Sequence, residues 1–201
     1  MNLPNKLTVS RFAMTAAFMV VLFSQIRFHE TIALLLFGAA AITDWLDGSI
    51  ARRRNLITNF GKLMDPLADK IMVCSAFIAF VGLSDGSGKS WVSAWMVVVI
   101  VAREFAITGL RLLAATKNLV LAAEGYGKHK TITQMVAIIA IFIFHSYGEW
   151  GSFGNIFGTT IAGKPWVQWL AEISTWLAVV LTIFSGVTYL WRNRQLFLSD
   201  M

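Results

Sequence analysis

Four aspartates are the residues of this chain whose types and spacing point most directly to chemistry. Asp44 and Asp47 are three positions apart, and Asp65 and Asp69 are four apart. On helices such neighbours share one face, so each pair would present two carboxylates in one direction. Carboxylates gathered at low dielectric repel one another unless cations neutralise them, and all-oxygen ligand sets select hard divalent ions. The spacing therefore predicts a site for one or two divalent cations, Mg²⁺ first, with Mn²⁺ or Ca²⁺ as rivals.

The rest of the chain is strongly apolar. Of its 201 residues 57% are hydrophobic and 14% are charged, and the mean hydropathy is +0.66. A helix needs about 20 apolar residues to cross a bilayer. The sequence therefore predicts an all-α integral membrane protein, a single domain over residues 1–201 with six transmembrane helices, at Leu7–Ile26, Thr31–Ile50, Pro66–Leu83, Trp91–Ala115, Thr131–Tyr147 and Trp166–Trp191.

The basic residues predict how these spans are oriented. With a cytoplasmic N-terminus, all but Arg27, Lys89 and Lys164 of the 17 Lys and Arg lie on or toward the cytoplasmic side. Both termini are then expected inside. The net charge of +6 fits cytoplasmic loops and anionic lipids, so we expect no nucleic-acid partner.

The two aspartate pairs are expected to meet. At about 1.5 Å per residue, Asp44 lies roughly 18 Å and Asp69 about 20 Å from the external helix ends, in the cytoplasmic half of the bilayer. Asp65 either caps a helix that begins at Pro66 or belongs to a longer helix kinked there. Two other interpretations remain: structural salt bridges to Arg52, Lys62 or Lys70, and a divalent-metal transporter, although transporters tend to place such groups near the midplane of repeated halves.

Small residues separate the aspartates. Gly48 and Ala51 lie one turn from Asp44 and Asp47 and leave space beside a metal for a nucleotide or phosphate. Gly61 does the same before the third predicted helix, and the Arg52 guanidinium suits a forked contact with phosphate.

The whole segment, Asp44-x2-Asp47-Gly48-x2-Ala51-Arg52-x8-Gly61-x3-Asp65-x3-Asp69, resembles the complete signature of the CDP-alcohol phosphatidyltransferase family at all eight fixed positions. The resemblance implies that Asp44, Asp47 and Asp65 are ligands of two metal ions, and that Asp69 is the general base and a further ligand. It implies a homodimer in a membrane and a CDP pocket lined by Asn5, Thr8, Asp47, Gly48, Ala51, Arg52 and Gly61.

Other segments resemble bacterial phosphatidylglycerophosphate synthases: residues 2–8 with Arg11, residues 65–70, Arg103-Glu104-Phe105 with Gly109-Leu110-Arg111, and residues 127–131. The resemblance implies transfer of the phosphatidyl group of CDP-diacylglycerol to sn-glycerol 3-phosphate, with release of CMP, in a bacterial cytoplasmic membrane. The active site would face the cytoplasm. Serine or inositol phosphate as the acceptor is the alternative within the family.

A phosphorylated acceptor needs a basic pocket of its own. Arg103 and Arg111 are eight apart, about two helical turns, and Lys128 and Lys130 begin the fifth predicted helix. We assign these four to the acceptor phosphate. Glu104 would either orient Arg103 or bind an amine, and the sequence leaves both open.

Two glycine-containing stretches are expected to carry no chemistry. The segment from Gly148 to Gly163 is predicted to be a flexible external loop. Residues 86–90 resemble the end of a phosphate-binding loop, but Leu83 occupies the position of its first glycine, so a turn is predicted.

Overall fold

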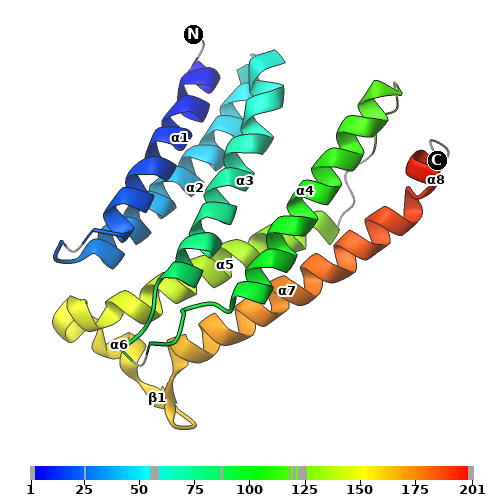
Figure 1. The fold of residues 1–201 in the computed structure, drawn as a ribbon. Helices are drawn as coiled ribbons and strands as arrows, with labels where there is room; N and C mark the ends of the chain where they lie inside the picture. The colour runs from blue at the N-terminus through cyan, green and yellow to red at the C-terminus, as the bar shows by residue number, and fades with distance from the viewer. Residues whose placement is uncertain are drawn as a thin grey trace.

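The computed structural model of the chain describes residues 3–24, 26–54, 59–86, 88–117, 119, 121 and 126–198. It is a bundle of long helices with a short hairpin at one end (Figure 1). The elements are α1 Leu3–Leu22, α2 His29–Arg54, α3 Asn59–Gly82, α4 Ala94–Thr116, α5 Tyr126–Ser146, the 3-10 helix η1 Tyr147–Phe153, α6 Asn155–Gly158, β1 Thr160–Ile161, β2 Lys164–Pro165, α7 Trp166–Arg192 and α8 Gln195–Leu198.

The long helices form two groups. α1 packs against α2 and α3, and α7 packs along α5 and against α4, while α5 also contacts α2 and α3. In Figure 1 the beginning of α1 and α8 lie toward the same end of the bundle, and the β1–β2 hairpin lies at the other. The C-terminal end of α2, the beginning of α3, the end of α4 and the beginning of α5 share the end with the termini.

Phenylalanine rings join the two groups in the core. Phe37 on α2 contacts Phe18 on α1 with ring centroids 6.0 Å apart and Phe142 on α5 at 6.2 Å. Phe80 on α3 meets Phe142 edge-on at 5.0 Å. All four side chains are fully buried, so this aromatic cluster fixes how α1, α2, α3 and α5 lie against one another.

Large apolar side chains also cover the outside of the bundle. Val20, Leu35, Phe105 and Val187 are each more than 60% exposed, on four different helices. In water such a surface would be an aggregation hazard, but it is the expected surface of helices that face lipid.

Two helical segments of the described residues are long and apolar enough to cross a membrane: His129–Phe153 and Trp166–Arg192. Shorter apolar stretches occur at Thr8–Leu22 and His29–Thr43. The six long helices coincide with the six predicted segments within a few residues at most ends.

One alternative is decided and one expectation is wrong. α3 begins at Asn59, so Pro66 lies inside a longer helix, the second of the two alternatives for Asp65, and Asp65 does not cap it. The stretch from Gly148 to Gly163 is largely structured, as η1, α6 and β1. Three indole N–H groups hold this segment: Trp150 donates to Thr31 Oγ1 at 2.9 Å, Trp166 to Ile156 O at 2.8 Å and Trp169 to Ile161 O at 2.9 Å.

Candidate functional site

The aspartate motif lies on two helices, as predicted. Asp44 and Asp47 are in α2, and Asp65 and Asp69 are in α3, and these two helices contact each other. Helical spacing therefore places each pair on one face of its helix. The side chains of Asp44, Asp47 and Asp65 lie outside the described part of the structure, so their convergence on a metal remains a prediction. The same holds for the side chains of Asn5, Gly48, Ala51, Arg52, Gly61 and Lys128.

The Asp69 side chain is described, and it lies partly buried beside basic residues. Its carboxylate is within electrostatic reach of Lys70, the next residue of α3, and of Lys130 on α5. Lys130 belongs to the predicted acceptor-phosphate set. The last aspartate of the motif and one predicted acceptor residue are thus brought together by three-dimensional structure, although they are far apart in the chain.

Glu104 and Lys130 form a buried ion cluster with Arg103, and this cluster joins α4 to α5 among the residues predicted to bind the acceptor phosphate. Glu104 of α4 is 6% exposed and Lys130 of α5 is 4% exposed. The Lys130 Nζ donates to Glu104 Oε1, and the Arg103 Nη1 donates to the same oxygen at 3.3 Å. Of the two roles that the sequence left open for Glu104, the geometry supports contact with Arg103. The link to Lys130 was not expected.

Lys70 joins this cluster from α3. Its Nζ donates to the hydroxyl of Thr108 on α4, which in turn donates to the backbone carbonyl of Glu104 at 2.7 Å. The charges of Arg103, Glu104 and Arg111 all act on Lys70. The sequence interpretation treated Lys70 as a possible salt-bridge partner for the aspartates and as the last residue of the 65–70 segment, but did not assign it to the acceptor site. Its position directly after Asp69, in a segment expected at membrane depth, was the signal for this contact with α4.

The guanidinium of Arg111 has a different partner from that of Arg103. Its Nε donates to the hydroxyl of Tyr189 on α7 at 3.3 Å, and its guanidinium lies over the Tyr189 ring at 5.7 Å from the centroid. Tyr189 is 4% exposed. Arg103 and Arg111 are therefore fixed by different partners, Arg103 by Glu104 and Arg111 by α7.

Thr8 of the predicted CDP pocket is fully buried on α1, as is Arg11 one turn further on. Polar side chains at this position in an apolar helix need a structural or functional reason. No contact with a nucleotide follows from burial alone, so the role of Thr8 remains a prediction.

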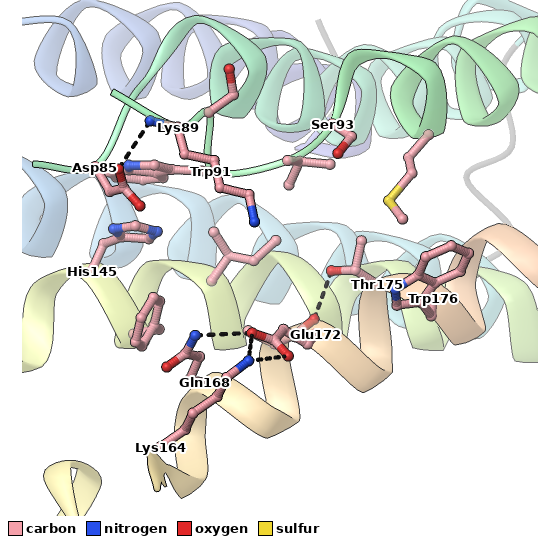
Figure 2. Close-up of a pocket in the computed structure, with 16 residues that line it drawn as sticks. Asp85, Lys89, Trp91, Ser93, His145, Lys164, Gln168, Glu172, Thr175 and Trp176 are labelled. Atoms are coloured by element: carbon pink, nitrogen blue, oxygen red, sulfur yellow. Dashed lines mark hydrogen bonds and ion pairs between the residues drawn. The ribbon is translucent and has the colours of Figure 1, made fainter. Parts of the chain in front are cut away.

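A cavity lies at the opposite end of the bundle, near the hairpin. It has a volume of about 420 Å³ and is lined by the 85–93 segment, α4, α5 and the beginning of α7 (Figure 2). Its charged residues include an ion pair: Lys164 Nζ lies 2.8 Å from Glu172 Oε1, which also accepts from Gln168 at 2.9 Å. His145 stacks on Trp91 with ring centroids 3.6 Å apart. These contacts fix the walls of the cavity, which contains none of the predicted site residues.

The adjacent segment around residues 86–90 is a turn, as predicted. Ser84 and Ser90 form an antiparallel bridge, and the Asp85 N–H donates to Lys89 O at 2.9 Å. Lys89 N donates back to the Asp85 carboxylate at 3.0 Å. These bonds close the turn on itself.

Similarity to known proteins agrees with the motif. Residues 1–184 match the model of the CDP-alcohol phosphatidyltransferase family. A Bacillus subtilis protein named CDP-diacylglycerol–glycerol-3-phosphate 3-phosphatidyltransferase is 38% identical over 96% of this chain and 95% of its own length. A Rickettsia bellii protein of the same name is 35% identical over 94% and 93%, and a Mycobacterium tuberculosis protein named probable phosphatidylglycerophosphate synthase is 34% identical over 95% and 81%. The chain belongs to the CDP-alcohol phosphatidyltransferase family.

Proposed function

We propose that this protein transfers the phosphatidyl group of CDP-diacylglycerol to sn-glycerol 3-phosphate, giving phosphatidylglycerol phosphate and CMP in phospholipid synthesis. The observation that carries the proposal is that the charge of Asp69, the last aspartate of the family motif, acts on Lys70 of α3 and Lys130 of α5. A phosphorylated acceptor needs such basic groups beside the reacting hydroxyl. The names of the similar proteins support the same pair of substrates.

The reaction is a displacement at phosphorus. The primary hydroxyl of glycerol 3-phosphate forms a new bond to the phosphorus that carries diacylglycerol, the bond from that phosphorus to CMP breaks, and CMP leaves. Asp69 takes the proton of the attacking hydroxyl, provided that its carboxylate reaches the acceptor within hydrogen-bond distance. Lys130, Arg103, Arg111 and Lys128 hold the acceptor phosphate by charge-assisted hydrogen bonds.

Members of this family generally use divalent metal ions. We propose two Mg²⁺ ions, held by Asp44, Asp47, Asp65 and Asp69, because four carboxylates form a hard, all-oxygen donor set. When bound, the ions would neutralise the pyrophosphate and the leaving oxygen. Gly48, Ala51, Arg52, Gly61, Asn5 and Thr8 are proposed to surround the CDP group, with Asp47 shared between metal and nucleotide.

The family is membrane-bound. We propose that residues 1–201 form one domain that crosses a bacterial cytoplasmic membrane six times and acts as a homodimer, with the termini and the active site on the cytoplasmic side. Arg103, Glu104 and Arg111 make α4 less apolar than α7, but their mutual and interhelical contacts support its placement within the bilayer.

The test is release of CMP from CDP-diacylglycerol by the purified protein across a panel of acceptors: glycerol 3-phosphate, serine, inositol phosphate and no acceptor. We expect turnover with glycerol 3-phosphate alone, and only with a divalent metal. Turnover with another alcohol instead would replace the acceptor but leave the family chemistry intact. Metal flux into proteoliposomes without CMP release would support the transporter alternative.

A further inference from the structure

Glu104 occupies an unusual position in the cluster, since one of its oxygens is shared by two cations from two helices. Lys130 reaches Oε1 from α5, and Arg103 reaches the same atom from α4 at 3.3 Å. Glu104 and Lys130 are both more than nine-tenths buried. A buried carboxylate and ammonium are costly to desolvate, and a packed apolar pair is often as stable. Stability alone therefore gives a weak reason for placing them here.

Besides Glu104, different features restrict the positions of the two cations. The stem of Arg103 lies against Gly186 of α7, which restricts its path, and its Nε is buried and makes no hydrogen bond within the described part of the chain. Lys130 carries a single ammonium on a flexible stem, which has no preferred direction of its own. Glu104 thus supplies the charged contact that sets where both head groups lie.

A third helix approaches Glu104 through Lys70 of α3. The Lys70 Nζ donates to the Thr108 hydroxyl, which donates to the backbone carbonyl of Glu104, and the charge of the Glu104 carboxylate acts on Lys70. Glu104 therefore lies near the place where α3, α4 and α5 meet, close to the residue that follows Asp69. A displacement of Glu104 would change the position of the basic groups relative to the aspartate motif.

We propose that Glu104 is a positioning residue for the acceptor: it holds Lys130 and Arg103 so that their remaining N–H donors converge on the phosphate of the acceptor alcohol. An arginine has five N–H donors and a lysine has three, so sharing one oxygen of Glu104 leaves donors for a phosphate. This inference rests on the proposed function and specifies how its acceptor site is built.

A positioning role predicts a selective kinetic effect. The neutral Glu104→Gln variant keeps the size of the side chain but removes the charge that orients both cations. We expect the KM for glycerol 3-phosphate to rise about tenfold, while kcat and the KM for CDP-diacylglycerol change by less than about twofold. This pattern is expected because the lost contacts with the phosphate are equally strong in the ground state and in the transition state. The inhibition constant of inorganic phosphate, competing with glycerol 3-phosphate, should rise in parallel.

Two further variants complete the experiment. Glu104→Asp keeps the charge but draws the carboxylate back by one methylene from Lys130 and Arg103, so we expect a KM for glycerol 3-phosphate clearly above that of wild type and below that of Glu104→Gln. Glu172→Gln is the matched control, because it removes a carboxylate from an ion pair with Lys164 at the opposite end of the bundle. It should leave both KM values unchanged.

A merely structural role would give a different pattern. If Glu104→Gln lowers the melting temperature and the active fraction but leaves the KM for glycerol 3-phosphate unchanged, the inference is wrong. If Glu104→Gln fails to fold, the KM values of Glu104→Asp decide: equal values for wild type and variant would also overturn it. Failure of the proposed function is distinguishable, because wild-type protein would then release no CMP with glycerol 3-phosphate.

Discussion

The side chain of Arg103 on α4 passes α7 at Gly186, where a Cβ atom would lie 2.9 Å from Arg103 Cγ. Real Cβ contacts are essentially never this close, so a larger residue would push Arg103 away. A glycine inside a helix costs roughly 0.5–1 kcal/mol relative to alanine. Here it gives Arg103 room beside α7 and helps to set the position of its guanidinium.

Gly186→Ala should therefore weaken the acceptor site. We expect the KM for glycerol 3-phosphate to rise about fivefold, the equivalent of ~1 kcal/mol, because Arg103 must shift to avoid the new methyl group. Gly109→Ala on α4 is the control, since a Cβ there meets no atom within 4 Å. Equal KM values for the two alanine variants would show that the position of Arg103 does not matter.

Asp69→Asn should abolish turnover. Removing a general base typically costs about 10²- to 10⁴-fold in rate, and the amide has no basic oxygen to take the proton. CMP release by purified protein measures the loss of turnover. Binding of a CDP-diacylglycerol analogue shows whether the variant still binds the nucleotide. Asp85→Asn, in the exposed turn at the other end of the bundle, should retain wild-type rates. A near-normal rate for Asp69→Asn would rule out its role as base.

Removal of divalent cations should stop the reaction reversibly. After chelation with EDTA we expect CMP release to fall to background, because four neighbouring carboxylates and a pyrophosphate would repel one another. Added back at equal free concentrations, Mg²⁺ should restore the highest rate, followed by Mn²⁺. Full activity in the chelated protein would argue for the alternative in which the aspartates form structural ion pairs.

Phe80→Ala should destabilise the bundle more than truncation of a side chain on its exposed apolar surface. Phe80 is fully buried and its ring lies 5.0 Å from Phe142 and 5.7 Å from Trp91. Truncation of a packed Phe costs about 3–5 kcal/mol through lost contacts and the cavity left behind. We expect a clearly lower melting temperature in detergent, whereas Phe105→Ala, at a side chain 71% exposed, should change it little. A reversed order would contradict the packing.

The proposed orientation can be tested by cysteine labelling. In a Cys74→Ser background, Lys89→Cys and Arg194→Cys place single thiols at exposed positions. The first lies between α3 and α4 and the second between α7 and α8, two connections at opposite ends of the bundle (Figure 1). A membrane-impermeant maleimide should label Lys89→Cys in intact cells, and Arg194→Cys only after permeabilisation. Labelling of Arg194→Cys in intact cells would invert the topology.

Local patterns were sufficient to predict the helices and the family. Apolar runs gave the six long helices, because hydrophobicity over about 20 residues reports the environment of a segment without reference to the others. Their ends were less well predicted: α3 begins seven residues before Pro66. The order of the 148–163 segment was missed, because its hydrogen bonds join it to residues outside it: Trp150 donates to Thr31, and Trp166 and Trp169 donate to backbone carbonyls of the segment.

The sequence by itself predicted the chemistry of the site and identified the family, since the type and spacing of Asp44, Asp47, Asp65 and Asp69 specify two helical faces and match the family signature. The partners of the basic residues were decided only by the tertiary structure. Lys130 meets Glu104 across 26 positions, Lys70 meets Thr108 across 38, and Arg111 meets Tyr189 across 78. Such pairs depend on how each helix is rotated and how far it is shifted against its neighbours. The packing of the whole bundle sets this rotation and shift, and no local sequence pattern encodes them.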